Sequence, residues 1–208
     1  MVNEKQVLGV LCSGRGTDLQ SIIDAIARGE VHASIGVVLA DKPDVYALER
    51  AKKAGIPAVC VNRKEYEDRE SFEKALLAEL SRAGVTLVVL AGFMRILTPY
   101  FVRAYAGRIM NIHPALLPSF PGAHAHRDVL AYGVKVSGCT IHFVDEGTDS
   151  GPIIAQAAVP VLDGDTEETL GARVLKEEHR LYPQVIEWYC EGRLQVEGRK
   201  VCVLPEKS

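Results

Sequence analysis

Apolar segments alternate with helical segments through the first half of this chain, and that order restricts the fold more than any other feature. The apolar runs cover residues 6–12, 33–40, 57–61 and 85–91. Residues 17–28, 45–54 and 66–83 between them are expected to be helices, and glycines follow the second and third. Continuous apolar runs are typical of strands buried on both faces of a parallel sheet. The alternation therefore predicts an α/β fold, a mostly parallel open sheet flanked by helices on both faces.

The second half of the chain changes character. A short strand is expected at residues 108–112, followed by a stiff loop that contains Pro114, Pro118, Pro121 and Gly122. Long irregular loops inside a domain are uncommon and usually functional. After a helix at 124–132, strands at 136–144 and 153–161 should pair antiparallel and extend the Rossmann-like sheet. A final helix should begin near residues 165–168 and kink at Pro183, which completes a single domain over residues 1–208.

Composition and charge exclude several classes of protein. The chain of 208 residues has a formal net charge of −3 and no basic stripe for nucleic acid. No apolar run reaches the roughly 18 residues that a membrane span requires, and the first residues lack a signal-peptide pattern. Five cysteines stand far apart without a Cys-x-x-Cys pair, which argues against disulfides and a zinc site. Cys12 and Cys60 are interpreted as small core residues. We expect a reduced, cytoplasmic protein that binds neither nucleic acid nor membrane.

Three polar residues stand out against this background: Asn111, His113 and Asp149. Pro114 prevents a regular strand from continuing past His113, so the chain should turn there and expose the histidine at a strand end. Ligands of open α/β sheets bind at the carboxyl ends of strands. An amide, an imidazole and a carboxylate can polarise a carbonyl group, move a proton and orient the imidazole. Together they predict an active site. His142 alternates with apolar neighbours and points either into this site or toward solvent.

Each of these residues has a simpler interpretation when taken alone. Asn111 could form a turn, His113 could bond a neighbouring backbone group, and Asp149 could be a turn residue before Ser-Gly-Pro. His124 and His126 lack a plausibly spaced third metal ligand, so a solvated helix start is favoured there and no metal is expected.

The first apolar run leads into a glycine-rich turn, Ser13-Gly14-Arg15-Gly16-Thr17-Asp18-Leu19, that opens a helix. Two glycines allow a tight turn and a close approach of backbone N–H groups to an anion. The dinucleotide-binding fingerprint has a third glycine at the position of Leu19. Because leucine stands there, the turn is expected to bind a single phosphate and not a pyrophosphate. A plain strand–helix turn capped by Thr17 or Asp18 fits the local sequence equally well.

Four segments match one family in order and spacing. They are Ser13-Gly14-Arg15-Gly16-Thr17, Ala91-Gly92-Phe93-Met94-Arg95-Ile96-Leu97, Asn111-Ile112-His113-Pro114-Ala115-Leu116-Leu117-Pro118, and His142-Phe143-Val144 through Asp149-Ser150-Gly151-Pro152. Over roughly residues 6–195 the chain resembles the folate-dependent phosphoribosylglycinamide formyltransferase family. The resemblance implies transfer of a formyl group from 10-formyltetrahydrofolate to the amine of glycinamide ribonucleotide in purine synthesis. We expect the protein to be a monomer or homodimer.

The resemblance also implies a role for each matching residue. Asn111 and His113 would donate hydrogen bonds to the oxyanion, while Asp149 would favour the imidazolium and help relay the proton, with His142 in support. Residues 1–107 would bind the ribonucleotide phosphate and residues 108–208 would carry catalysis and the folate site. The ribonucleotide contacts would be Gly16, Thr17, Asp18 and Glu178. The folate contacts would be Arg69, Met94, Arg95, Ile96, Leu97, Asn111, Asp145, Glu146, Gly147, Thr148 and Asp149.

Other functions stay open at this point. A formyltetrahydrofolate hydrolase shares the Asn-His-Asp chemistry but delivers the formyl group to water. That family usually carries an N-terminal regulatory domain, whereas the first strand here is expected close to the start of the chain. A methionyl-tRNA formyltransferase should add a C-terminal nucleic-acid-binding domain. A non-catalytic module that binds a phosphate ligand is the alternative from another class.

Overall fold

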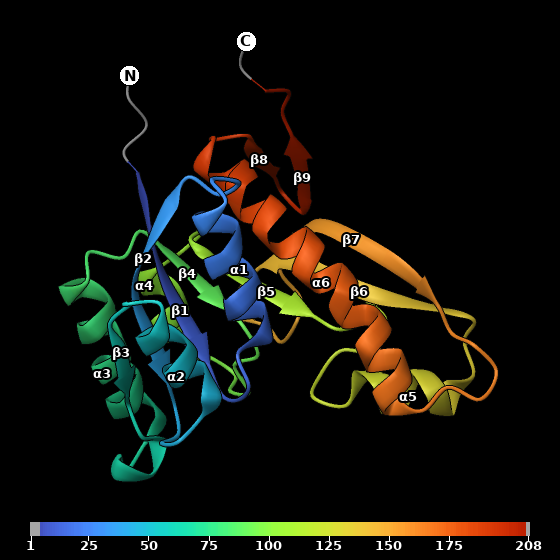
Figure 1. Ribbon diagram of the computed structural model, residues 1–208, viewed down its shortest axis with the longest axis horizontal. Coiled ribbons are helices and arrows are strands. Elements are labelled where there is room, and N and C mark those ends of the chain that lie inside the picture. The colour runs from blue at the N-terminus through green and yellow to red at the C-terminus, as the bar shows by residue number, and fades with distance from the viewer. Residues whose placement is uncertain (1–4, 207–208) are drawn as a thin grey trace.

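The computed structural model describes residues 5–206, whose strands form one nine-stranded sheet with the order β3-β2-β1-β4-β5-β6-β7-β9-β8. Residues 1–4, part of the segment considered for a signal peptide, lie outside the described residues. The strands are β1 (Gln6–Cys12), β2 (Ala33–Ala40), β3 (Ala58–Cys60), β4 (Leu87–Leu90), β5 (Ile109–His113), β6 (Val136–Phe143), β7 (Ile153–Pro160), β8 (Leu194–Glu197) and β9 (Lys200–Val203). The first five pair in parallel, whereas β6 pairs antiparallel with both β5 and β7. Figure 1 shows β6 and β7 reaching away from the parallel strands.

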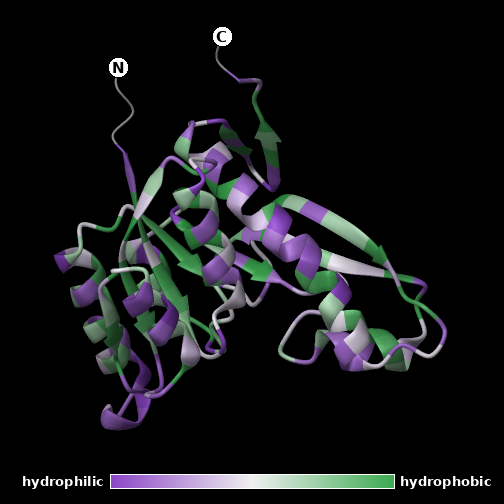
Figure 2. Cartoon of the chain, viewed as in Figure 1, coloured by the Kyte–Doolittle hydropathy of each residue, from purple (hydrophilic) through white to green (hydrophobic). Residues whose placement is uncertain are grey.

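Helices cover both faces of the sheet. They are α1 (Thr17–Ala27), α2 (Tyr46–Lys53), α3 (Arg69–Arg82), α4 (Pro99–Ala104), α5 (Ala125–Tyr132) and α6 (Glu167–Cys190), with a 3₁₀ turn at Arg63–Glu65. Alternate residues of each central strand face opposite sides. In β1, Val10 belongs to the core shared with α1, α2 and α6, and Leu11 belongs to the core shared with α3 and α4. Figure 2 shows the hydrophobic colouring along the central strands and the alternation along α6.

The predicted fold class is confirmed: the sheet is mixed, mostly parallel, with antiparallel strands in the C-terminal half. Helix α3 begins at Arg69, later than expected, because Asp68 caps it by accepting a hydrogen bond from the Ser71 N–H at 2.7 Å. Thr166 caps α6, and that helix continues through Pro183. Helix α4 and the β8–β9 hairpin were not expected from the sequence.

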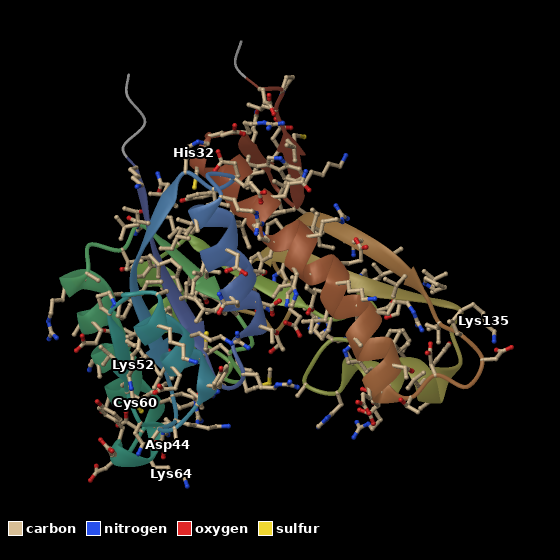
Figure 3. All side chains as sticks on the ribbon, viewed as in Figure 1. His32, Asp44, Lys52, Cys60, Lys64 and Lys135 are labelled. Atoms are coloured by element: carbon tan, nitrogen blue, oxygen red, sulfur yellow. The ribbon has the colours of Figure 1, made fainter. Side chains whose placement is uncertain are left out.

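The two cysteines expected in the core differ in burial. Cys60, interpreted as a core residue, is exposed because β3 is the edge strand of the sheet, whereas Cys12 is fully buried. Figure 3 labels Cys60 in the part of the view where Asp44 and Lys64 are also labelled. Within residues 5–206, no helix is both long and apolar enough to cross a bilayer.

Candidate active site

The direction of the strand order reverses between β1 and β4, since β2 and β3 lie on one side of β1 while β4 and β5 lie on the other. In open α/β sheets a crevice forms at such a point, outside the carboxyl ends of the strands, and ligands bind there. A cavity of about 280 Å³ lies at this edge. It is lined by residues 92–97, 111–114 and 122–123 and by residues from 142–149.

Strand β5 supplies two of the polar residues, and β6 supplies their neighbour. Asn111 and His113 are two positions apart, so their side chains emerge on the same face of β5. His142 lies directly opposite Asn111 in the antiparallel register, which brings the two side chains together. The Asn111 Nδ2 atom is 3.2 Å from Nε2 of His142. His142 therefore points into the site and not toward solvent.

The protonation of His142 fixes the orientation of the Asn111 amide. His142 Nδ1 is 2.9 Å from the Phe143 carbonyl, which can only accept, so Nδ1 carries the proton. Burial lowers the pKa of His142, which favours the neutral ring with a lone pair on Nε2. That lone pair accepts a hydrogen bond from the Asn111 amide. The second N–H of the amide is left for a ligand.

His113 is buried, contrary to the expected exposure at the strand end, with 4% of its surface accessible. The loop that follows Pro114 folds back over the ring, and the Phe120 carbonyl lies 2.8 Å from His113 Nε2. Because a carbonyl accepts, Nε2 is the donor in this contact. Nδ1 consequently faces the cavity side, where Asp149 Oδ2 lies 3.5 Å away.

Asp149 reaches the site from the loop between β6 and β7. Its backbone has a positive φ of 50°, a conformation that aspartate and asparagine tolerate better than most residues. Its Oδ2 atom accepts a hydrogen bond from the Gly122 N–H at 2.8 Å, and its Oδ1 atom is 3.8 Å from Nε2 of His142. The structure thus brings all three predicted catalytic residues to one cavity.

Most residues expected on the folate side also line this cavity. They are Met94, Arg95, Ile96, Leu97, Asn111, Asp145, Gly147, Thr148 and Asp149. Glu146 is not among them, and its carboxylate pairs with Arg103 at 2.7 Å. Arg69 lies in an adjoining groove with Arg63 and donates a hydrogen bond to the Ile96 carbonyl at 3.1 Å.

The glycine-rich turn after β1 has the geometry of an anion-binding loop. Gly16 is the N-cap of α1 with φ 70°, and a Cβ there would lie 2.7 Å from the Ala47 Cβ. No side chain caps this helix, so the interpretation of Thr17 or Asp18 as a cap is wrong. The first backbone N–H groups of α1 therefore lack a capping side chain and can receive an anion.

A buried acidic pair lies beneath this turn. Asp18 and Glu178 are both buried, and the Asp18 charge acts on Glu178. Burial raises the pKa of Asp18 to about 6, while burial and then the neighbouring Asp18 raise the pKa of Glu178 to about 8. His179 Nε2 lies 3.6 Å from Asp18 Oδ1. The Asp18 carboxyl group thus points into the protein, so its backbone N–H is the group available to a phosphate.

The phosphate turn and the cavity are neighbours. The Ser13 N–H donates to the Gly92 carbonyl at 3.0 Å, and the Met94 N–H donates to Ser13 Oγ at 2.9 Å. A ligand on the turn and a ligand in the cavity would therefore sit side by side at one edge of the sheet.

Some residues that shape the site carried no signal in the sequence. The Phe120 carbonyl and the Gly122 N–H act through the backbone, so side-chain chemistry could not reveal them. A long loop rich in proline was the only available sign of their importance. Among the described residues, no group of three or more His, Cys, Asp or Glu could hold a metal ion.

Comparison with known proteins gives consistent matches. The model of the formyl transferase family matches residues 6–186. The phosphoribosylglycinamide formyltransferase of Escherichia coli (strain K12) is 46% identical over 187 residues, 90% of this chain and 88% of that protein. The crystal structure of glycinamide ribonucleotide transformylase 1 from Symbiobacterium toebii aligns with a TM-score of 0.95 at 50% identity, over 97% of this chain and 95% of that chain.

A formyltetrahydrofolate deformylase from Pseudomonas syringae pv. tomato aligns with a TM-score of 0.90 but with 27% identity, over 97% of this chain and 67% of that chain. The higher identity to the transferases favours transfer over hydrolysis. The chain therefore belongs to the formyl transferase family, and within that family to the phosphoribosylglycinamide formyltransferases. The resemblance found in the sequence is confirmed, and the chain is a formyltransferase.

Proposed function

We propose that this enzyme transfers the formyl group of 10-formyltetrahydrofolate to the amine of N1-(5-phosphoribosyl)glycinamide in de novo purine biosynthesis. The observation that carries the proposal is the convergence of Asn111, His113 and Asp149 on one cavity, with His113 Nδ1 3.5 Å from Asp149 Oδ2. Two relatives named phosphoribosylglycinamide formyltransferase support it, at 46% and 43% identity over 90% and 91% of this chain.

The amine attacks the formyl carbon and produces a tetrahedral oxyanion. Asn111 donates its second N–H to that oxygen, because His142 holds the first. The Phe120 carbonyl accepts the Nε2–H of His113, so the ring donates through Nδ1 only as the imidazolium, which carries a proton on both nitrogens. The hydrogen bond from His113 strengthens as negative charge develops on the oxygen.

Collapse of the intermediate forms the new amide and breaks the bond between the formyl carbon and the folate nitrogen N10. The amine must lose a proton, and N10 must gain one. Asp149 is an acid–base group 3.5 Å from His113, and the Gly122 N–H holds one of its oxygens. We assign the proton relay to Asp149, acting directly or through a water molecule.

The ribonucleotide phosphate binds the turn after β1, at the backbone N–H groups of Gly16, Thr17 and Asp18. Glu178 lies below it and, with a pKa of about 8, holds its proton at neutral pH. It can then donate a hydrogen bond to a ribose or glycinamide oxygen. The first half of the chain thus binds the phosphate and supplies Arg69 and residues 94–97 to the folate site. The second half carries catalysis and the rest of the folate site, and Arg69 pairs with the folate glutamate.

A formyl-transfer assay with and without the glycinamide acceptor tests the proposal. We expect folate product to appear only with the acceptor, in equal amount to formylated ribonucleotide by mass spectrometry. Equal folate release without the acceptor would instead establish the hydrolase, which the fold of the deformylase makes the second candidate. We further propose that the enzyme is cytoplasmic, holds no metal and binds no nucleic acid, and that it is a monomer or homodimer. Sedimentation velocity tests the assembly state, and metal analysis tests the metal content.

A further inference from the structure

The segment 92–98 after β4 lines much of the cavity but has no regular helix or strand. It holds two large apolar side chains in solvent, since Met94 is 67% and Ile96 is 56% exposed. Phe93 and Leu97, which flank this pair in the sequence, are buried in the core under α3. An irregular segment keeps two apolar side chains exposed toward a ligand only if contacts with the rest of the protein hold its backbone in place; we call these contacts anchors.

Asp41 supplies the first anchor. It follows β2, its side chain is fully buried, and its Oδ2 atom accepts a hydrogen bond from Nε of Arg95. The other carboxylate oxygen has no hydrogen-bond partner within the part of the chain that the structure describes. Burial of an unpaired carboxylate raises the free energy of the folded state. The ion pair with Asp41 therefore holds the Arg95 guanidinium at the end of β2.

Glu73 supplies the second anchor, at the other end of the segment. It lies on α3, is 2% exposed, and accepts hydrogen bonds from the Thr98 N–H at 2.7 Å and from the Thr98 hydroxyl. Thr98 is the N-cap of α4, yet its hydroxyl makes no capping bond. Threonine at this position usually caps the helix. Here its hydroxyl is directed to Glu73 instead.

Asp41 and Glu73 thus both accept hydrogen bonds from residues of the 92–98 segment. We propose that Asp41 and Glu73 are positioning residues that hold the 92–98 segment ready for the reduced folate. This inference rests on the proposed function. Preorganisation of a loop raises affinity because less order must be created on binding. The two carboxylates should therefore affect folate binding selectively.

The test compares Asp41→Asn, Asp41→Ala and Glu73→Gln with the wild type, and uses Glu79→Gln as the matched control. Glu79 lies on the same helix as Glu73, but it pairs with Arg82 near the surface at 2.9 Å. Titration calorimetry with 5-formyltetrahydrofolate, a stable reduced folate, gives the dissociation constant without any turnover. Steady-state kinetics gives the KM of each substrate and kcat.

We expect the folate dissociation constant to rise about tenfold in Asp41→Asn and Glu73→Gln, and further in Asp41→Ala, which removes the acceptor of the Arg95 Nε–H. The ribonucleotide KM and kcat should change by less than about threefold. If Asp41→Ala does not fold, the isosteric Asp41→Asn still decides the matter.

Unchanged folate affinity in both isosteric variants, or an equal rise in both KM values, would overturn the anchoring role. A merely structural role predicts lower thermal stability without that selectivity. A wild-type enzyme that binds no reduced folate would overturn the proposed function as well, so the two failures are distinguishable.

Discussion

Replacement of Asp149 by asparagine isolates the charge of this residue from its shape. Asparagine keeps an oxygen that can accept the hydrogen bond from the Gly122 N–H at 2.8 Å, and it tolerates the positive φ of 50° at this position. The loop between β6 and β7 should therefore stay in place. The substitution removes the negative charge beside His113 and, with it, the capacity of this side chain to take up a proton.

The size of the effect follows from the 3.5 Å between His113 Nδ1 and Asp149 Oδ2. Coulomb's law with an effective dielectric constant of about 20 gives about 5 kcal/mol for two full charges at this separation. The Asp149 side chain is 14% exposed, and the charge on the ring develops only in part, so we expect about 3–4 kcal/mol of transition-state stabilisation to be lost.

A loss of that size lowers kcat by about 10² to 10³. The folate and ribonucleotide dissociation constants should change by less than about threefold, because neither depends on the developing charge. Single-turnover formyl transfer and calorimetric titration measure the two quantities separately. Near-normal turnover in a folded Asp149→Asn enzyme would refute the electrostatic role of this carboxylate.

Three further changes test other parts of the site. Gly16→Ala would put a Cβ 2.7 Å from the Ala47 Cβ at a φ of 70°; urea unfolding should show about 1–3 kcal/mol of lost stability, with a higher ribonucleotide KM. Asn111→Ala removes an oxyanion donor and should lower kcat by about 10² to 10³ at constant folate affinity; a fall in affinity alone would contradict this role. Glu178→Gln tests a pH effect: burial raises the pKa of Glu178 from 4.5 to about 8, so between these values native protein holds a proton that unfolded chain has lost. As pH rises from 4.5 to about 8, the unfolding free energy should fall in the wild type and fall less in the variant. Identical pH slopes of the unfolding free energy in the two proteins would contradict a raised pKa of Glu178 in the native state.

The central sheet was predictable because its strands are apolar on both faces and alternate with helices. The expected strand at residues 33–40 matches β2. Helix α4 was missed because its six residues are too few for a periodic pattern, although Thr98 before Pro99 is a helix-start signal. The β8–β9 hairpin was missed although two short segments with apolar residues lie on either side of Gly198, whose φ of 62° allows the turn.

The site was predictable only in part. The sequence indicated which chemical groups belong to it, and the opposite positions of Asn111 and His142 follow from antiparallel pairing once the register is known. Burial of His113 under the Phe120 carbonyl was not predictable, because it depends on how an irregular loop folds back. The same holds for Asp41, whose partner Arg95 is distant in sequence.

Catalysis by His113, as opposed to mere ligand binding, is tested most directly by His113→Ala in single-turnover formyl transfer together with folate titration. We predict that the transfer rate falls by about 10² to 10⁴. The folate dissociation constant should stay within about threefold of the wild-type value. A folded variant that transfers the formyl group at the wild-type rate would contradict the assignment of this cavity as the catalytic centre.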